Sequence, residues 1–156
     1  LQKERSEGSS YLELAQFIRS HGDPEHVESD LVQLFRRVAF NVAVGNRDDH
    51  LRNHGFLLGQ GGWRLAPAFD VNPNIDKAEH VLNIDDSDNR PELATVLETA
   101  PFYDLSDTEA TRILREVIRA VSDWRAVARR HRISAADIEL TAGAFGALSD
   151  VIGGNV

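Results

Sequence analysis

One long helix that loses its polar face toward its C-terminal end restricts the fold of this chain more than any other feature. Apolar residues recur at helical spacing at Leu31, Leu34, Phe35, Val38 and Val42. The last part of this segment, residues 38–45, is apolar on nearly every side, so we expect it to cross the centre of the domain. Gly45 is well placed to end the helix, because glycine readily adopts the left-handed conformation found at helix C-termini.

Shorter patterns predict the elements before and after this helix. Apolar spacing from Ser10 predicts a short helix, which residues 21–24 end. The segment 56–67 predicts a β-hairpin around a glycine-rich turn. An acidic loop then covers residues 74–91, with a short strand expected at 80–84.

The C-terminal part predicts three more helices. A short one is expected at 93–99. Ser106 and Glu109 have the spacing of a capping box, and an apolar stripe follows for five turns as far as Ala128. Ser134 is expected to begin the last helix. The fold class is therefore mainly α, a helical bundle with one small β-hairpin.

Composition limits the kind of protein this can be. A chain of 156 residues that is 42% apolar fits one domain with a real core. The net charge of −8 argues against a broad nucleic-acid surface of its own. The absence of cysteine excludes disulfides and thiolate metal sites and fits a cytoplasmic location. No apolar run has the length of a membrane span, so no membrane association is expected.

The polar loop after the long helix carries residues that could take part in catalysis or bind a metal ion. Arg47-Asp48 is followed, five residues after the aspartate, by Asn53. The predicted hairpin then leads to Phe69-Asp70. Protein kinases space a catalytic aspartate and a Mg²⁺-binding asparagine in the same way and place a second Mg²⁺-binding aspartate after a hairpin. Carboxylate and amide oxygens are the ligands that Mg²⁺ prefers, and phosphoryl transfer depends on such groups.

The run from 40 to 73, Phe-Asn-Val-Ala-Val-Gly-Asn-Arg-Asp-Asp-His-Leu-Arg-Asn through the hairpin to Ala-Phe-Asp-Val-Asn-Pro, resembles the HipA-like serine/threonine kinases. These are the toxins of type II toxin–antitoxin pairs. The resemblance is strongest over residues 28–75 and extends to about 148, which implies a protein-kinase-like C-lobe at 10–148. Residues 1–9 are then a frayed polar segment and 149–156 a flexible tail.

The resemblance also implies roles for individual residues. Asp48 would be the catalytic aspartate, and Asn53 and Asp70 would hold Mg²⁺. The ATP phosphates would be bordered by His50, Leu51, Arg52, Asn53, Phe69 and Asp70. The family further implies protein substrates, self-inactivation by autophosphorylation, and a helix-turn-helix antitoxin through which the toxin reaches DNA only indirectly.

A kinase also needs a glycine-rich loop over the phosphates and a strand lysine. Neither Lys3 nor Lys77, the two lysines of the chain, lies in such a strand. The chain also begins at Leu1 and contains no methionine. We therefore expect the N-terminal lobe to lie outside this chain, and this fragment by itself to be inactive.

Three other functions fit the same residues. A small-molecule kinase of the aminoglycoside or choline type would use the same centre. A non-catalytic lobe would only bind a partner. A metal-dependent hydrolase would use the cluster of Asp48, Asp49, His50 and His54. Within that cluster, Asp49 is expected to be solvated or ion-paired.

Overall fold

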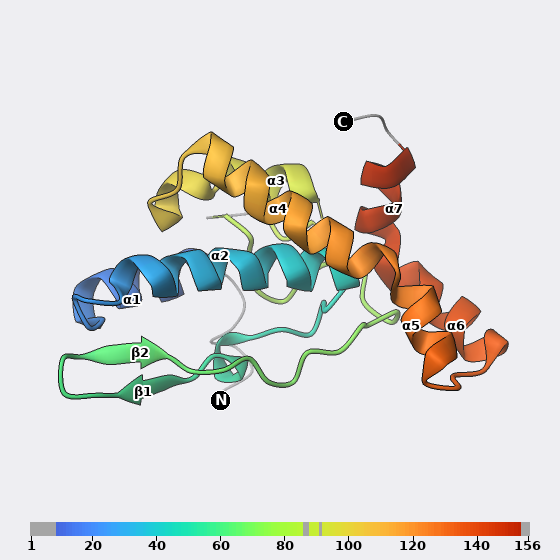
Figure 1. Cartoon of the computed structure of the whole chain (residues 1–156), viewed down its shortest axis with the longest axis horizontal. Helices are drawn as coiled ribbons and strands as arrows, with labels where there is room; N and C mark the ends of the chain where they lie inside the picture. Colours follow the sequence, from blue (N-terminus) through green and yellow to red (C-terminus); the bar gives the residue numbers. More distant parts are fainter. Residues whose placement is uncertain (1–8, 86–87, 91, 154–156) are drawn as a thin grey trace.

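Helix α2 (Val27–Val44) crosses the middle of the domain, as its sequence predicts, and the other elements are arranged around it (Figure 1). The computed structural model describes residues 9–85, 88–90 and 92–153. From 38 to 44 every side chain of α2 is buried except Phe40, which is 37% exposed. The predicted mainly helical class with one small hairpin is confirmed.

The other elements follow in chain order. They are α1 (Tyr11–His21), the 3₁₀ turn η1 (Leu51–Asn53), β1 (Phe56–Leu58), β2 (Trp63–Leu65), α3 (Leu93–Glu98), η2 (Ala100–Tyr103), α4 (Asp107–Ser122), α5 (Trp124–Arg130), α6 (Ala135–Thr141), η3 (Ala142–Phe145) and α7 (Gly146–Gly153). Among these described helices, none is long and apolar enough to span a bilayer.

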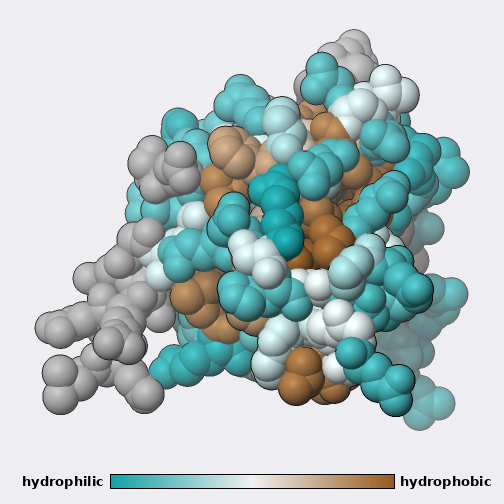
Figure 2. All heavy atoms as spheres, turned by 90° about the vertical axis from the view of Figure 1, so that its left-hand side faces the viewer, coloured by the Kyte–Doolittle hydropathy of each residue, from teal (hydrophilic) through white to brown (hydrophobic). Residues whose placement is uncertain are grey.

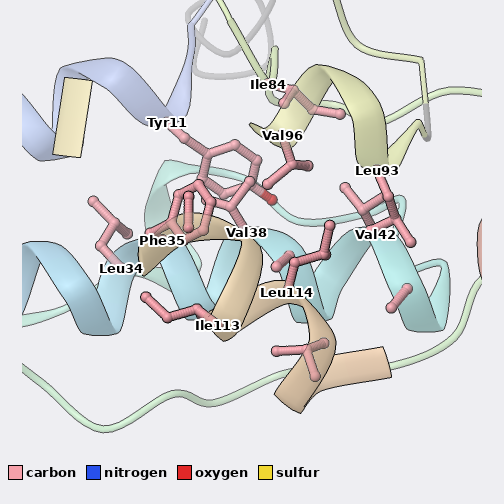
Figure 3. Packing of buried hydrophobic residues seen from close by; sticks show 14 of the residues in the cluster. Tyr11, Leu34, Phe35, Val38, Val42, Ile84, Leu93, Val96, Ile113 and Leu114 are labelled. Atoms are coloured by element: carbon pink, nitrogen blue, oxygen red, sulfur yellow. The ribbon is translucent and has the colours of Figure 1, made fainter. Parts of the chain in front are cut away.

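The hydrophobic core lies between α2 and the helices on either side of it. Figure 3 shows side chains of α1, α3 and α4 converging on those of α2. Tyr11, Phe35 and Ile113 are among the largest side chains that are fully buried. Capping contributes as predicted, because the side chains of Ser106 and Glu109 each bond the other's backbone N–H at the start of α4. Ser10 and Glu13 do the same for α1.

The hairpin is antiparallel, with Leu57 opposite Arg64, and it is attached to the start of α2. Arg64 donates from Nε and Nη2 to the two carboxylate oxygens of Asp30, at 3.1 and 3.2 Å, and Leu65 N donates to the same group at 2.9 Å. Leu57 and Leu58 are 59% and 68% exposed. The hairpin turn lies on the end of the molecule shown in Figure 2, where hydrophobic patches interrupt a largely hydrophilic surface.

The predicted five-turn helix is wrong in one respect, because it is divided at Asp123 into α4 and α5. The apolar stripe continues across the break, so its period does not reveal the change of direction. Trp124, the first residue of α5, stacks on Phe145 with ring centroids 4.0 Å apart. This stacking places the start of α5 against η3.

Two smaller predictions also need correction. Residues 80–84 form no strand, although Asn83 joins Ser10 in an isolated β-bridge beside the start of α1. The last helix is followed by η3 and by α7, which ends at Gly153, so residues 149–153 of the expected tail are helical. The rest of that tail and residues 1–8 of the expected frayed segment lie outside the described residues.

Gly45 ends α2 as predicted, with φ 66° and ψ 38°. A Cβ at this position would lie 2.1 Å from the backbone oxygen of Ala144, which cannot move aside as a side chain could. We therefore expect Gly45→Ala to lower the free energy of unfolding by at least about 2 kcal/mol, through backbone strain and this clash. Urea denaturation measures the change.

Gly143→Ala is the matched control, because a Cβ at Gly143 would meet nothing within 4 Å. Its unfolding free energy should equal or slightly exceed that of the parent. Equal stabilities for the two variants would show that the helix end does not depend on Gly45.

Candidate functional site

The loop that follows α2 directs some of its side chains into the domain and others toward solvent. In this segment, residues 46–54, which we call the Asp48 loop, Asn46 and Asp49 are each only 2% exposed. The side chain of Asp48, between them, is 60% exposed. The loop thus presents one carboxylate to solvent and buries the next, although the two are identical in the sequence.

The buried carboxylate of Asp49 is the polar centre of the loop. Its Oδ2 accepts hydrogen bonds from Tyr11 Oη at 2.7 Å and Asn41 Nδ2 at 2.7 Å, and it lies 2.8 Å from His54 Nε2. Burial and the neighbouring Asp49 charge raise the pKa of the Tyr11 phenol, which therefore remains a donor. Asp49 was expected to be solvated or ion-paired. It is not solvated, because α1, α2 and the loop itself enclose it, and its contact with His54 fits the second alternative.

Asn41 connects this centre to the end of α2. Its side-chain oxygen accepts from Asn46 Nδ2 at 3.2 Å, and its backbone oxygen accepts from Asn46 N at 2.8 Å. Asn41 is 4% exposed within an otherwise apolar stretch of helix. A single amide in such a stretch is the sequence signal that could have identified this residue, because a buried polar group needs a partner.

The turn η1 carries the next group of predicted site residues. Asn53 is 7% exposed, and within the described part of the chain its side-chain amide has no hydrogen-bond partner. Arg52 is exposed, and its Nη2 lies 3.4 Å from His50 Nε2. Leu51 is half-buried against the core. The turn therefore combines one available amide with two basic side chains at the surface.

The hairpin returns the chain to the Asp48 loop. Ala66 N donates to Gly55 O at 2.9 Å, directly after the loop. The Phe69 ring also lies beside Gly55, since a Cβ added there would be 3.7 Å from its Cε1. Phe69 and Asn53 both line a cavity of about 350 Å³ between this segment, α2 and α4.

Asp70 has a left-handed backbone, with φ 55°. This conformation is uncommon for a residue with a side chain, although aspartate tolerates it better than most. Its carboxylate is exposed and accepts from Asn72 Nδ2 at 3.0 Å. A strained conformation held in an exposed acidic residue marks a position worth testing for function.

The three predicted principal residues thus lie on consecutive segments of one loop–hairpin–loop unit. Asp48 faces solvent from the loop, Asn53 lines the cavity, and Asp70 follows Phe69 on the returning chain. No direct contact joins the three across residues 9–85 of the structure. Their roles in catalysis and in Mg²⁺ binding stay predictions.

Asp48 has one neighbour that the sequence did not indicate. Lys77 Nζ forms an ion pair with Asp48 Oδ1 from the loop after Asp70. Arg47, the residue before Asp48, donates from Nη1 to Lys77 O at 2.7 Å. The segment around Lys77 therefore lies on the outer side of the Asp48 loop.

The two histidines of the predicted metal cluster contact different residues. His54 is directed to the buried Asp49, whereas His50 is beside Arg52. Within the described ranges, no three His, Cys, Asp or Glu side chains gather in a way that could hold a metal ion. The geometry thus gives no support to a hydrolase built on Asp48, Asp49, His50 and His54.

His80 packs against the inner side of the loop and was not expected to be buried. It is 3% exposed, and Val81 N, from the next residue, donates to Arg47 O at 3.2 Å. Burial lowers the pKa of His80 to about 4, and the nearby Arg47 charge acts in the same direction. The ring is therefore neutral at physiological pH.

This arrangement, a helical domain with an exposed aspartate on a buried loop and a hairpin behind it, belongs to a known class of domains. The chain is a member of the HipA-like C-terminal domain family, whose model matches residues 1–125.

Two similar proteins extend this finding. A Haemophilus influenzae protein named "Putative kinase" is 37% identical over 65 residues, which are 39% of this chain and 18% of that protein. The structure of HipA from Shewanella oneidensis MR-1, solved with HipB and operator DNA, has the same fold, with a TM-score of 0.70 and 17% identity. That similarity covers 94% of this chain and 37% of the Shewanella chain. The chain thus spans well under half the length of either protein.

Two buried tyrosines provide a test of the Asp49 centre. Tyr11 donates to the buried Asp49, so Tyr11→Phe removes a hydrogen bond to a charged group and should cost about 1–3 kcal/mol in unfolding free energy. Tyr103 is as deeply buried, but its hydroxyl has no partner among the described residues. Tyr103→Phe should therefore leave stability unchanged or raise it slightly. Equal losses in both variants, measured by urea denaturation, would contradict this description of Asp49.

His80 should make stability depend on pH. Its pKa is about 4 in the folded chain and about 6.5 when unfolded, so the unfolded state binds more protons between these values. The stabilisation is complete above pH 6.5 and is lost as pH falls toward 4, by up to about 3 kcal/mol. Urea denaturation of the parent and of His80→Leu at several pH values measures this difference. A parent and variant whose stabilities fall in parallel would show that His80 is not the cause.

Proposed function

We propose that this domain supplies the catalytic and Mg²⁺-binding half of an ATP-dependent serine/threonine protein kinase of the HipA type. The observation that carries the proposal is the exposed carboxylate of Asp48 on a loop that is held in place by the buried, hydrogen-bonded Asp49. A fixed carboxylate that remains open to solvent can meet an incoming hydroxyl. The family membership and the named kinase relative support the same function.

In this proposal Asp48 orients the serine or threonine hydroxyl and accepts its proton. The hydroxyl oxygen forms a bond to the γ-phosphorus as the bond between that phosphorus and ADP breaks. Because little covalent chemistry is required of the protein, the rate depends on position and charge. The Asp49 centre is what would keep the Asp48 loop in a fixed position during this step.

Asn53 and Asp70 are the proposed Mg²⁺ ligands, and their chemistry fits the ion. Mg²⁺ prefers oxygen donors, which the Asn53 amide and the Asp70 carboxylate provide. The amide is available, and one Asp70 oxygen remains beside the one bonded by Asn72. When bound, Mg²⁺ would neutralise charge on the phosphates. His50, Leu51, Arg52 and Phe69 are proposed to border the nucleotide, with the two basic residues nearest the phosphates.

The remaining half of the active site is proposed to lie in a separate N-terminal lobe. A kinase needs a glycine-rich loop and a strand lysine to hold the triphosphate, and this lobe would provide both. The short span of this chain relative to the proteins it matches supports such a division. Residues 10–148 would then be the C-lobe, and autophosphorylation elsewhere in the longer protein would inactivate it.

The Shewanella complex supports a proposal for the partners. HipA in that structure is bound with HipB and operator DNA. We propose that the present protein is likewise a toxin held by a helix-turn-helix antitoxin, and that it reaches DNA only through this partner. The net charge of −8 supports indirect contact. Binding to an operator through an antitoxin, and action on a protein substrate, would both occur in the cytoplasm.

Transfer of ³²P from ATP by the full-length protein, to itself or to a protein acceptor, tests the proposal. Asp48→Asn and Asp70→Asn should each lower transfer by at least about 100-fold, because one loses the proton acceptor and the other a metal ligand. Asp76→Asn is the matched control. Asp76 is an exposed aspartate of the neighbouring loop, and the same loss of charge there should leave transfer close to that of the parent.

Two outcomes would contradict the proposal. One is full transfer by the Asp48 or Asp70 variant, and the other is equal loss with the Asp76 variant. The isolated domain should transfer little phosphate, because a triphosphate bound only by this half is poorly held.

A further inference from the structure

We propose, on the basis of the proposed function, that Lys77 is a further catalytic residue. Its ammonium would remain beside Asp48 and donate a hydrogen bond to an oxygen of the phosphoryl group during transfer. The observation behind this assignment is the ion pair between Lys77 Nζ and Asp48 Oδ1. Nothing in the spacing of the Asp48 loop indicates it, because Lys77 comes from a separate segment after Asp70.

The position of Lys77 is set by backbone contacts. Asn74 N donates to Gly45 O at 2.8 Å, which joins this segment to the end of α2. The Asn74 side-chain oxygen then accepts from the backbone N–H of Asp76 at 2.9 Å and of Lys77 at 3.0 Å. Arg47 Nη1 holds the Lys77 carbonyl from the other side. The backbone of Lys77 is thus held directly by Arg47 of the Asp48 loop and, through Asn74, by Gly45 at the end of α2.

Stability does not explain the ion pair. The side chains of Lys77 and Asp48 are 40% and 60% exposed, and exposed pairs of this kind add little to folding free energy. The segment is already attached through Asn74 and Arg47. The ion pair is therefore better explained by a negatively charged group of a substrate that approaches the Asp48 carboxylate.

The positive charge of Lys77 would favour phosphoryl transfer at Asp48. A triphosphate that approaches Asp48 brings two negative groups together, and their repulsion opposes the reaction. An ammonium that touches both offsets this repulsion and stabilises charge on the phosphoryl oxygens in the transition state. Lys77 donates hydrogen bonds only, and the proton of the acceptor hydroxyl still goes to Asp48.

The kind of cation also matters. The chain has two lysines against fifteen arginines, yet a lysine stands at this place. Its ammonium is a compact charge with three donors, which carboxylate and phosphate oxygens can share. The planar guanidinium of arginine would instead favour two parallel bonds to one of them. Arginine at position 77 should therefore replace lysine only in part.

The test uses the full-length protein and steady-state ³²P transfer. Lys77→Met should lower kcat by about 100-fold, the effect of removing one preorganised donor, with a much smaller change in KM for ATP. Lys77→Arg should recover part of the lost kcat. Lys3→Met makes the same change at the other lysine and serves as the control, with kcat expected to match the parent. Thermal unfolding of each variant shows whether it is folded.

A double variant tests whether Lys77 acts together with Asp48 or only through its general charge. If Lys77 and Asp48 act together, adding Lys77→Met to Asp48→Asn should slow transfer by much less than the loss that Lys77→Met causes in the parent. Independent, multiplying losses would overturn the pairing. The inference is overturned if Lys77→Met is folded and at least as active as the parent. If Asp48→Asn still loses activity in that case, the proposed function stands. An active Asp48→Asn enzyme would instead overturn the proposed function.

Discussion

The buried carboxylate of Asp49 is the interaction on which the candidate site depends. It gathers a phenol from α1, an amide from α2 and an imidazole from the loop that follows. A buried carboxylate without such partners would be strongly unfavourable, so these bonds favour the loop conformation in which this group is satisfied. Asp48 is exposed in a defined direction because its neighbour is held inside.

The same helix supports the rest of the site through a polar stripe on its surface. Asp30, Arg37 and Asn41 are spaced seven and four residues apart, which places them on one face of α2. Asp30 holds strand β2, Arg37 donates to the Ala66 carbonyl, and Asn41 bonds Asp49. Three successive parts of the loop–hairpin–loop unit are therefore attached to one rigid element, which fixes them relative to one another.

Local patterns in the sequence predicted much of this architecture. Helix periodicity and capping pairs such as Ser106–Glu109 act within a few residues, so they identified the helices, and the fixed spacing of Asp48 and Asn53 identified the loop. The burial of Asp49 could not be predicted in this way, because it depends on Tyr11, 38 residues earlier. The ion pair of Lys77 with Asp48 spans 29 residues and was missed for the same reason.

The close approach of Gly45 to Ala144 has a consequence for the order in which the domain is made. The turn that leads into the Asp48 loop packs on backbone that is synthesised near the end of this chain. A nascent polypeptide that has left the ribosome only as far as Asp70 contains every predicted ligand but lacks this support. That order delays assembly of the Asp48 loop until the C-terminal helices have emerged.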